Sequence, residues 1–458
     1  MNIPELLKQQ QSFFKTSKTR DINYLKSSLK SLRSEIINNE KNICDALEKD
    51  FKKPVFETYL TEIGVVISEI DLAIKHIYKW SRPKRIRPSL LNFPSTDYIY
   101  SEPYGTVLII APWNYPFQLT ISPLVAAVVA GNTVVLKPSE LTPNTSKLVE
   151  EILSKVFTEE HVATVQGGIP KTTELLAQKW DYIFFTGSVP VGKIVAKAAA
   201  NHLTPVTLEL GGKSPCIIDE TVNIKLTAKR LVWGKFMNAG QTCIAPDYIL
   251  VKSEIKTNLL ESLTQEIEKA YTANPETSYD YPRIINKENL QRLEKMLDNV
   301  NIVHGGIINE KDNYMSPTII DSPSLNSEVM KGEIFGPILP VLEFETEEDI
   351  NDIVSKYDKP LSFYVFSNKK AFTKKLIKKY SFGGGVINDS VIHFSNHRLP
   401  FGGVGESGIG SYHGRNGFET FTHKKGIVKK GNWLDVPLRY APYKGKLKSL
   451  KTMLKWLG

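Results

Sequence analysis

The first fifth of the chain has hydrophobic residues at helical spacing. From about residue 22 to 51, apolar side chains alternate with Lys, Glu and Ser in a period close to 3.6, and glycine first appears at Gly64. This pattern predicts long amphipathic helices that form a packing layer. The next stretch, residues 81–105, is rich in proline and then in β-branched and aromatic residues, which predicts an extended hairpin or arm.

From Thr106 onward, short β-rich runs alternate with helical runs. The expected strands are TVLIIAP, TVVLKPSE, ATVQGG and DYIFFTGS, and the helical segments between them are LVAAVVAGN, SKLVEEILSKVF and TELLAQK. Such alternation is typical of a parallel sheet built from strand-helix-strand units. A second series starts after Leu210 with CIIDE, a long helical stretch and YILVKS. We therefore predict an α/β protein with two such sheets and a boundary near residues 208–212.

Composition is that of an ordinary globular protein, with 458 residues, 41% hydrophobic and 23% charged. The net charge of +9 is concentrated at one end, because residues 424–458 contain ten Lys or Arg residues and only one acidic residue, Asp435. The rest of the chain is neutral overall, which argues against a nucleic-acid-binding protein.

The three cysteines are too few and too far apart for a disulfide framework or a thiolate-rich metal site, which favours a reducing compartment. The chain has no apolar run of 18 residues and no N-terminal secretory pattern. We expect a cytoplasmic protein.

The C-terminal segment is basic and amphipathic. In KGKLKSLKTMLKWLG, one helical face would carry the leucines and the other faces the lysines: Leu447, Leu450, Leu454 and Leu457, against Lys448, Lys451 and Lys455. Such a helix could lie on an anionic membrane surface, or it could dock on a second subunit or cover a substrate tunnel. It is too short to span a bilayer.

Cys243 is the cysteine with the most informative surroundings. It lies in MNAGQTCIAPDYILV, after a helical stretch and before a strand. A thiol attacks as its thiolate, and helix N-termini or nearby cations can lower its pKa. A buried, inert cysteine is the commoner situation, and we assign it to Cys44 and Cys216.

Glu209 lies between two leucines in TLELGGKSP. A carboxylate in apolar company has a raised proton affinity, which suits a general base near neutral pH. The equally plausible alternative is a carboxylate that caps a turn or pairs with Lys213. The glycines at 211 and 212 permit close approach of the backbone, so the side chain could face an occupied cleft.

Other polar residues follow predicted strands. Asn114, between Pro112 and Pro116 in APWNYPF, could be a preorganised donor to an oxyanion or a simple turn residue. Lys137 and Glu140 in LKPSE would lie at the carboxyl end of the sheet, where ligands of α/β folds bind, although solvated surface charge is the alternative.

A glycine-bearing turn in FFTGSVPVGK, with Gly187 and Gly192, precedes a predicted helix. Backbone amides at such a helix start suit a phosphate group, but the spacing is not the G-x-G-x-x-G fingerprint. Glu333 in GEIFGP and the glycine-rich PFGGVGESG could each be simple loops.

Taken together, seven strings identify the chain as a member of the aldehyde dehydrogenase superfamily. In chain order they are PWNYP, LKPSE, FTGS, LELGGKSP, GQTC, EIFGP and PFGGVGESG. The short N-terminus, the YHGRNGFETFTH ending and the DVPLRYAPY tail resemble the class 3 branch, whose members act on medium-chain, long-chain and aromatic aldehydes.

This resemblance implies roles for the motif residues. Cys243 would be the nucleophile, Glu209 the base and Asn114 an oxyanion donor. Cofactor contacts would come from residues of three segments: Lys137 and Glu140 at the adenosine ribose, Gly187, Ser188 and Gly192 around the pyrophosphate, and Glu333 and Phe335 at the nicotinamide ribose and ring. No metal is implied. Glu140 should disfavour a 2′-phosphate, which favours NAD and leaves NADP possible.

Substrate size depends on three further residues. Trp233 and Met237 are four apart on the expected helix before Cys243, and Tyr115 follows Asn114. They could line an apolar tunnel or simply belong to the core.

The family fold implies four regions. Residues 1–80 and 106–208 would form a Rossmann-like NAD(P)-binding domain, and residues 209–398 an α/β catalytic domain. Residues 81–105 and 399–430 would form a small β oligomerisation arm, and 431–458 the basic tail. The resemblance also implies a homodimer. A catalytically silent structural homologue and a cofactor-independent thiol esterase remain alternatives.

Overall fold

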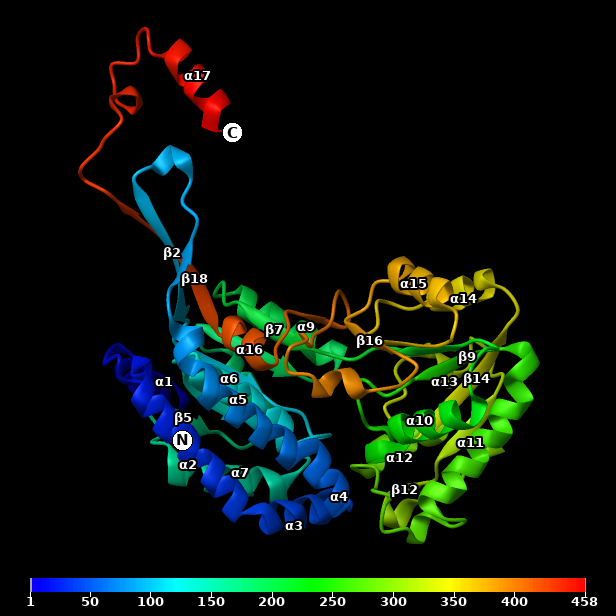
Figure 1. The fold of residues 1–458 in the computed structure, drawn as a ribbon. Coiled ribbons are helices and arrows are strands. Elements are labelled where there is room, and N and C mark those ends of the chain that lie inside the picture. Colours follow the sequence, from blue (N-terminus) through cyan, green and yellow to red (C-terminus); the bar gives the residue numbers. More distant parts are fainter. Residues whose placement is uncertain (1, 458) are drawn as a thin grey trace.

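The N-terminal layer of this computed structural model, which describes residues 2–457, is helical. It contains α1 (Ile3–Lys15), α2 (Ile22–Asn38), α3 (Glu40–Phe51), α4 (Val55–Thr58), the π-helical turn η2 (Tyr59–Ile63) and α5 (Gly64–Ser81). The long helices expected over residues 22–51 are thus confirmed. In Figure 1 these helices form the blue side of one lobe.

The first lobe is built on a six-stranded sheet of order β17-β7-β6-β3-β4-β5. Its parallel strands are β3 (Thr106–Ile110), β4 (Thr133–Lys137), β5 (Val162–Thr164), β6 (Tyr182–Thr186) and β7 (Val206–Glu209). The helices that connect them are α6 (Gln118–Val129), α7 (Pro143–Val156), α8 (Ile169–Leu176) and α9 (Val189–Ala200). The alternation of strands and helices predicted from Thr106 is therefore confirmed.

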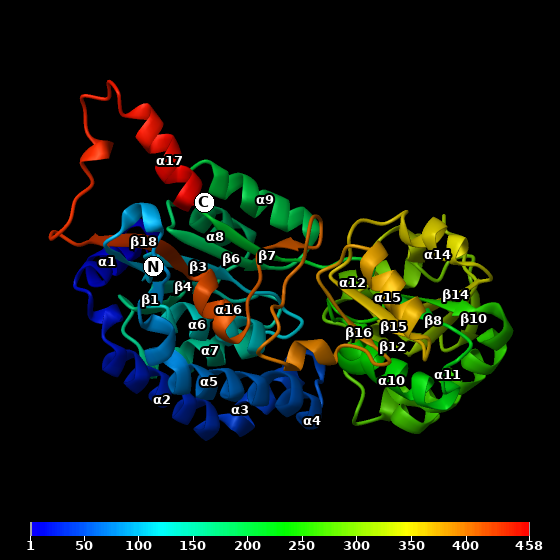
Figure 2. The ribbon, with the colours of Figure 1, turned by 45° about the horizontal axis from the view of Figure 1, so that its top comes forward.

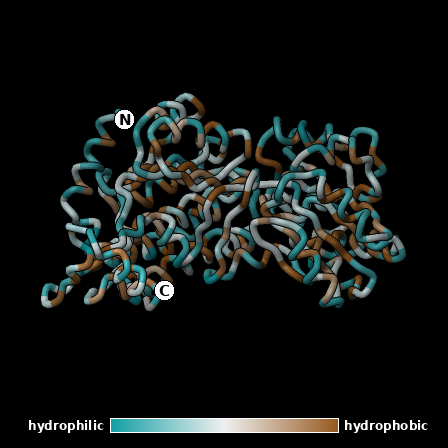
Figure 3. The backbone as a smooth tube through the Cα atoms, turned by 90° about the horizontal axis from the view of Figure 1, so that it is seen from above, coloured by the Kyte–Doolittle hydropathy of each residue, from teal (hydrophilic) through white to brown (hydrophobic). Residues whose placement is uncertain are grey.

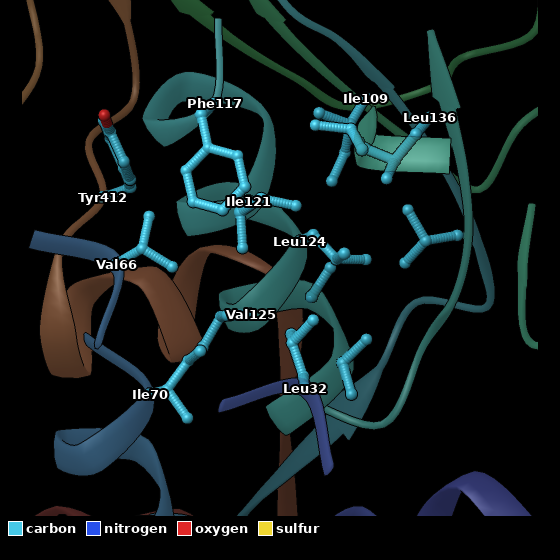
Figure 4. Packing of buried hydrophobic residues seen from close by; sticks show 14 of the residues in the cluster. Leu32, Val66, Ile70, Ile109, Phe117, Ile121, Leu124, Val125, Leu136 and Tyr412 are labelled. Atoms are coloured by element: carbon cyan, nitrogen blue, oxygen red, sulfur yellow. The ribbon is translucent and has the colours of Figure 1, made fainter. Parts of the chain in front are cut away.

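Both faces of this sheet are apolar because side chains alternate along a strand. In β3, Val107 and Ile109 pack with α5 and α6 residues in one core, whereas Leu108 and Ile110 pack with Ile3 and other residues of α1 on the opposite face. Figure 4 shows the first of these cores, in which α6 presents its side chains to the sheet and to α5. The strands are thereby buried on both sides.

The second lobe contains a seven-stranded sheet of order β10-β13-β14-β9-β8-β15-β16. Its strands are β8 (Pro215–Ile218), β9 (Tyr248–Lys252), β10 (Asn301–His304), β13 (Thr318–Asp321), β14 (Ile338–Phe344), β15 (Ser362–Phe366) and β16 (Gly384–Ile387). Only β10 runs antiparallel to its neighbour in this sheet.

The helices of this lobe are α10 (Ile224–Phe236), α11 (Lys256–Tyr271), α12 (Lys287–Lys295), α13 (Glu328–Lys331), α14 (Glu347–Val354) and α15 (Lys370–Lys379), and β11 (Ile308–Asn309) pairs with β12 (Tyr314–Met315). The lobe has its own hydrophobic core. Figure 2 shows the two lobes side by side, so the predicted α/β class with two parallel-type sheets is confirmed.

An arm projects from the first lobe (Figure 1). It is a three-stranded antiparallel sheet of β1 (Lys84–Ile86), β2 (Ser95–Pro103) and β18 (Thr422–Lys430). Within the range 399–430, only β18 joins this sheet. Strand β17 (Gly408–Ile409) pairs with β7 of the first lobe instead, and α16 (Gly414–Thr420) packs against α5 and α6. The functional division into domains stays a prediction.

The C-terminal tail ends in α17 (Leu447–Leu457), which lies away from both lobes in Figure 1. Leu447, Leu450 and Leu454 are exposed, whereas the side chain of Leu457 and residue 458 lie outside the described part of the chain. Figure 3 shows the mixture of hydrophobic and hydrophilic segments along the backbone. Within residues 2–457, no helix is both long and apolar enough to cross a membrane. Contact of the tail with a membrane surface stays a prediction.

The packing of α6 makes a testable contribution to stability. Leu124 is fully buried between the sheet and the N-terminal helices. We expect Leu124→Ala to lower the free energy of unfolding by about 2 to 5 kcal/mol, because it removes buried methyl groups and leaves a cavity. Leu226→Ala, at a position of α10 that is 45% exposed, is the control and should change it by less than about 1 kcal/mol. Urea unfolding followed by tryptophan fluorescence compares them, and equal losses would contradict the assigned core.

Candidate active site

Two cavities meet at the seam between the lobes. Both are lined by Cys243 and by Glu209, and they also share Leu119, Thr186 and Leu210. Glu209 is the last residue of β7 in the first sheet, whereas Cys243 lies in the loop that leads to β9 in the second sheet. A sulfur atom and a carboxyl group from different lobes therefore face the same space.

The first cavity, of about 290 Å³, is largely apolar. Tyr115, Trp233 and Met237, the three residues singled out for a tunnel, all line it. Trp233 is 40% exposed and so is not a core residue, whereas Met237 lines the cavity and also belongs to the core of the first lobe. Further lining residues had no sequence motif to mark them: Leu60, Val65, Val391 and Phe394. Phe401, from the string PFGGVGESG, also lines the cavity.

The second cavity, of about 320 Å³, collects the polar motif residues. Its lining includes Asn114, Gly187, Ser188, Glu333 and Phe335, together with Asn289 and Arg292 of α12, which sequence reasoning missed. Two polar side chains on an ordinary amphipathic helix carry no motif, and only the fold brings them here. The structure thus brings together five predicted cofactor or oxyanion residues from three separate segments.

Three predicted cofactor residues do not line this cavity. Gly192 is packed under Leu210, because a Cβ atom at position 192 would lie 2.7 Å from Leu210 Cδ2. Lys137 forms an ion pair with Glu140 at the carboxyl end of β4. Lys137 is buried, so the alternative of solvated surface charge is wrong for this residue. Glu140 points toward the start of α8, where its Oε1 lies 3.8 Å from the position of a Cβ atom on Gly168.

The loop before Cys243 has an unusual backbone. Asn238 (φ 56°), Ala239 (φ 52°) and Gly240 (φ 72°) are all left-handed. This conformation costs a residue other than glycine about 1 to 2 kcal/mol. Gln241 stabilises it, because its Nε2 donates to the carbonyl oxygens of Asn238 (3.1 Å) and Arg283 (3.0 Å) and its Oε1 accepts from the Ile285 amide (3.0 Å). These three hydrogen bonds hold the loop in one conformation.

Hydrogen bonds tie this loop to the turn that carries Asn114. Asn114 Nδ2 donates to the Gln241 carbonyl oxygen (3.0 Å), and Asn238 Nδ2 donates to the Asn114 carbonyl oxygen (2.8 Å). Next to them, the Tyr115 hydroxyl is 2.6 Å from Thr242 Oγ1. Asn114 is 3% exposed, so its amide is held in place rather than free in a surface turn, and its second N–H can serve another acceptor.

The electrostatics of the site favour protonated groups. Burial raises the pKa of the Cys243 thiol well above its usual range, and the Glu333 and Glu209 carboxylates raise it further. Burial likewise raises the pKa of Glu333 to about 8, and Asp247 adds to this effect. In the described residues, the charged groups that act on the Cys243 thiol are therefore carboxylates, not the pKa-lowering cation that sequence analysis considered.

Glu209 is a buried carboxyl group without a hydrogen-bond partner in residues 2–457. Burial raises its pKa well above the ordinary carboxyl range, as the apolar sequence context predicts. The alternative pairing with Lys213 is wrong, because Lys213 Nζ contacts Asp247 Oδ2 (2.6 Å) and the carbonyl oxygens of Val329 and Gly332. A buried, unpaired carboxyl group is costly to maintain, which favours a chemical role.

The second cavity has the features of a dinucleotide site. Helix α9 begins at Val189, and Ser188 at its N-cap makes no side-chain capping bond, so the amides of Val189 and Val191 are available to an anion, whereas Pro190 has no N–H. A Cβ atom on Gly211 would lie 2.2 Å from Glu333 Oε2, so a larger residue there would displace that carboxyl group. Thr186 Oγ1, between the two cavities, is buried without a partner in the described part of the chain. These residues fit a polar, phosphate-bearing ligand.

Comparison with known proteins agrees with this geometry. The aldehyde dehydrogenase family model matches residues 2–427. The chain is 46% identical over 446 residues to the 4,4′-diaponeurosporen-aldehyde dehydrogenase of Staphylococcus aureus, with 97% of each chain covered. It is 41% identical over 448 residues to the dimeric NADP-preferring aldehyde dehydrogenase of Rattus norvegicus, with 97% of this chain and 99% of the other covered.

A solved structure described as the substrate-bound state of Staphylococcus aureus AldH superimposes with a TM-score of 0.97 at 45% identity, covering 99% of this chain and 100% of that one. Motifs, architecture and similarity thus agree, and the chain belongs to the aldehyde dehydrogenase family.

Proposed function

We propose that this enzyme oxidises medium-chain or long-chain aliphatic or aromatic aldehydes to carboxylic acids, with Cys243 as nucleophile and NAD or NADP as hydride acceptor. The observation that carries the proposal is the position of Cys243 and Glu209 at the junction of an apolar cavity and a polar one. The thiol can thus face a substrate on one side and a cofactor on the other.

In the first half of the reaction, the Cys243 thiol loses its proton to solvent, and the resulting thiolate attacks the aldehyde carbon. The free N–H of Asn114 Nδ2 and the backbone amide of Cys243 stabilise the oxyanion that forms. When bound, the nicotinamide ring supplies the acceptor for the hydride that leaves this carbon. The substrate remains attached to Cys243 as a thioester.

In the second half, Glu209 accepts a proton from water, whose oxygen bonds to the thioester carbon. The carbon–sulfur bond breaks, the acid is released and the thiol is restored. Since Glu209 faces both cavities and has no partner in residues 2–457, its oxygens are free to bind that water. Neither a silent homologue nor a cofactor-independent esterase is favoured by the comparisons.

The cofactor contacts follow from the second cavity. Glu333, Phe335 and Ser188 would hold the nicotinamide half and the pyrophosphate, with the Lys137–Glu140 pair at the adenosine ribose. A carboxylate at a ribose hydroxyl disfavours a 2′-phosphate, which supports NAD. Relatives described as NADP-preferring support NADP as an alternative.

The apolar cavity supports a hydrophobic substrate. Its walls are aromatic and aliphatic, with few polar groups besides those of the reacting centre. The staphylococcal relative is named for an aldehyde of the diaponeurosporene type, which is in line with a long apolar chain. The dimeric relative supports a homodimer, for which the β1-β2-β18 arm offers a contact surface. A cytoplasmic location stays a prediction.

Two substitutions separate the halves of the reaction. We expect Cys243→Ala to abolish cofactor reduction, followed by the absorbance of reduced nicotinamide at about 340 nm, because no thioester forms. Glu209→Gln should retain a burst of at most about one reduced cofactor per subunit and lose about 10²-fold or more in turnover. The reason is that the thioester still forms but is hydrolysed slowly without the base. Cys44→Ala is the control, and full turnover by Cys243→Ala would refute the mechanism.

The pH dependence of hydrolysis should report Glu209. Since its raised pKa keeps the carboxyl group protonated in acid, and only the carboxylate accepts a proton, thioester hydrolysis should accelerate as pH rises through that pKa. Rapid-quench measurement of acyl-enzyme decay gives the profile. The rise of the hydrolysis rate with pH should disappear in Glu209→Gln. A rise centred in the ordinary carboxyl range would contradict the assignment.

Substrate length should depend on Trp233. Removing its indole by Trp233→Ala exposes one wall of the apolar cavity, so we expect kcat/KM for decanal to fall by about tenfold and that for acetaldehyde to change by less than about threefold. Trp433→Ala, at a position that is 73% exposed and does not line the cavity, serves as the control. Equal losses for both aldehydes would argue against a chain-binding role.

A further inference from the structure

A short segment of the N-terminal layer reaches the reacting centre from outside both sheets. It comprises α4 and the π-helical turn η2, between α3 and α5. Single π-turns inside helices are frequent at functional sites. Two carboxyl groups of this segment, Glu57 and Glu62, point inward and contact the two loops that carry Cys243 and Asn114.

Glu62 holds the Asn114 side. Its Oε2 accepts hydrogen bonds from the amides of Phe117 (2.9 Å) and Gln118 (3.0 Å), at the start of α6. Its Oε1 is 2.6 Å from Lys53 Nζ in a fully buried ion pair. Lys53 Nζ also lies 4.0 Å from the centre of the Tyr115 ring. The turn after β3 is therefore fixed from this side.

Glu57 holds the Cys243 side. Its Oε2 accepts a hydrogen bond from the Asn238 amide at 3.0 Å, across 181 residues of sequence. Asn238 is the first residue of the left-handed stretch, and its side chain in turn donates to the carbonyl oxygens of Asn114 (2.8 Å) and Gln241 (3.2 Å). Glu57 thus acts on a residue that joins the proposed oxyanion donor to the loop of the proposed nucleophile.

We propose that Glu57 is a positioning residue for aldehyde oxidation: by accepting the Asn238 N–H, its carboxylate keeps residues 238–240 in the left-handed conformation that places Cys243 beside Asn114. This inference rests on the proposed roles of Cys243 and Asn114. Glu57 lines neither cavity and contacts neither the sulfur nor the substrate space, so its effect passes through Asn238.

The charged surroundings give this hydrogen bond a pH dependence. The groups that face Glu57 are Lys53, which is engaged by Glu62, then Asp280, and the tyrosines Tyr115, Tyr271 and Tyr281. Burial raises the pKa of Glu57 to about 7, against the opposing effect of Lys53. A charged acceptor binds an amide more strongly than a neutral one. The loop should therefore be held more firmly above neutral pH than below it.

The test compares Glu57→Gln, which keeps an acceptor oxygen but cannot titrate, with Glu57→Leu, which keeps the volume and removes the acceptor. Glu48→Gln, on the exposed face of α3, is the control. One readout is the rate of the cofactor reduction burst with hexanal as a function of pH. The second is the alkylation rate of Cys243 by iodoacetamide in protein without cofactor, with Cys243→Ala as blank.

We expect Glu57→Leu to slow both rates by about 10- to 100-fold with KM changed less than about threefold, since a displacement near 1 Å has such effects on reacting groups. Glu57→Gln should stay within about threefold of the wild-type burst rate at neutral pH and lose the component of its pH profile near pH 7, a value set by burial of the group. A merely structural role would leave that component unchanged.

Two results would overturn the proposal. One is a folded Glu57→Leu variant with wild-type burst and alkylation rates, and the other is a Glu57→Gln profile that retains the component near pH 7. If Glu57→Leu does not fold, as judged by circular dichroism, the Glu57→Gln profile decides alone. If the wild type reduces no cofactor with any aldehyde, the proposed function fails, while unchanged alkylation of Cys243 in folded Glu57→Leu would still refute the positioning role.

Discussion

The hydrogen bonds of Asn238 connect the two lobes of this enzyme at the point where its chemistry is proposed to occur. One lobe supplies the turn after β3 and the other the loop before β9. The core of the first lobe also takes in Met237, Ile244 and Ile285 of the second, and Cys243 packs against it. Apolar packing is not directional, so it does not by itself orient the Asn114 side chain relative to the sulfur of Cys243. The side-chain amide of Asn238 spans the seam between the lobes, because its Nδ2 donates to the carbonyl oxygens of Asn114 and Gln241.

The connection requires a costly backbone conformation in the loop before Cys243, and neighbouring side chains stabilise it. Left-handed backbone at Asn238 and Ala239 persists only where surrounding contacts over-determine it. Here Gln241 uses its whole amide group on the loop and on the backbone at Arg283 and Ile285, and Glu57 satisfies the amide that starts the stretch. These hydrogen bonds favour one conformation of the loop rather than an ensemble, while Asn238 Oδ1 is buried without a partner in the described residues.

The same seam holds groups that the fold does not neutralise. Glu209 has no partner in the described residues, while the nearby Lys213 is held by Asp247 and by two carbonyl oxygens. A buried carboxyl group and a buried thiol without a cation both favour their protonated forms. Local rules of stability are broken here in favour of groups that exchange protons, and such exceptions are expected at functional sites.

The sequence predicts those parts of the site whose residues lie in short, recognisable motifs. Alternation in β3 and its neighbours predicts buried parallel strands, and Cys243, Glu209 and Asn114 each lie in a distinctive string at a strand end. It did not reach Glu57, since a glutamate in a short helical segment has no local mark and its partner is 181 residues away. The family resemblance also assigned residues 399–430 to the arm, whereas β17 within that range pairs with β7 at the edge of the first sheet.

The two cavities explain why one sulfur position serves both halves of the proposed reaction. An aldehyde in the apolar cavity and a cofactor in the polar one approach Cys243 from different sides, so a hydride can leave the substrate without either ligand displacing the other. Apolar walls keep bulk water from the thioester, and the water that remains must bind where a polar group is unpaired. Glu209, which borders both cavities, is such a group, so the carboxyl group left unsatisfied by the fold is also the one that we propose as the base for the hydrolytic water.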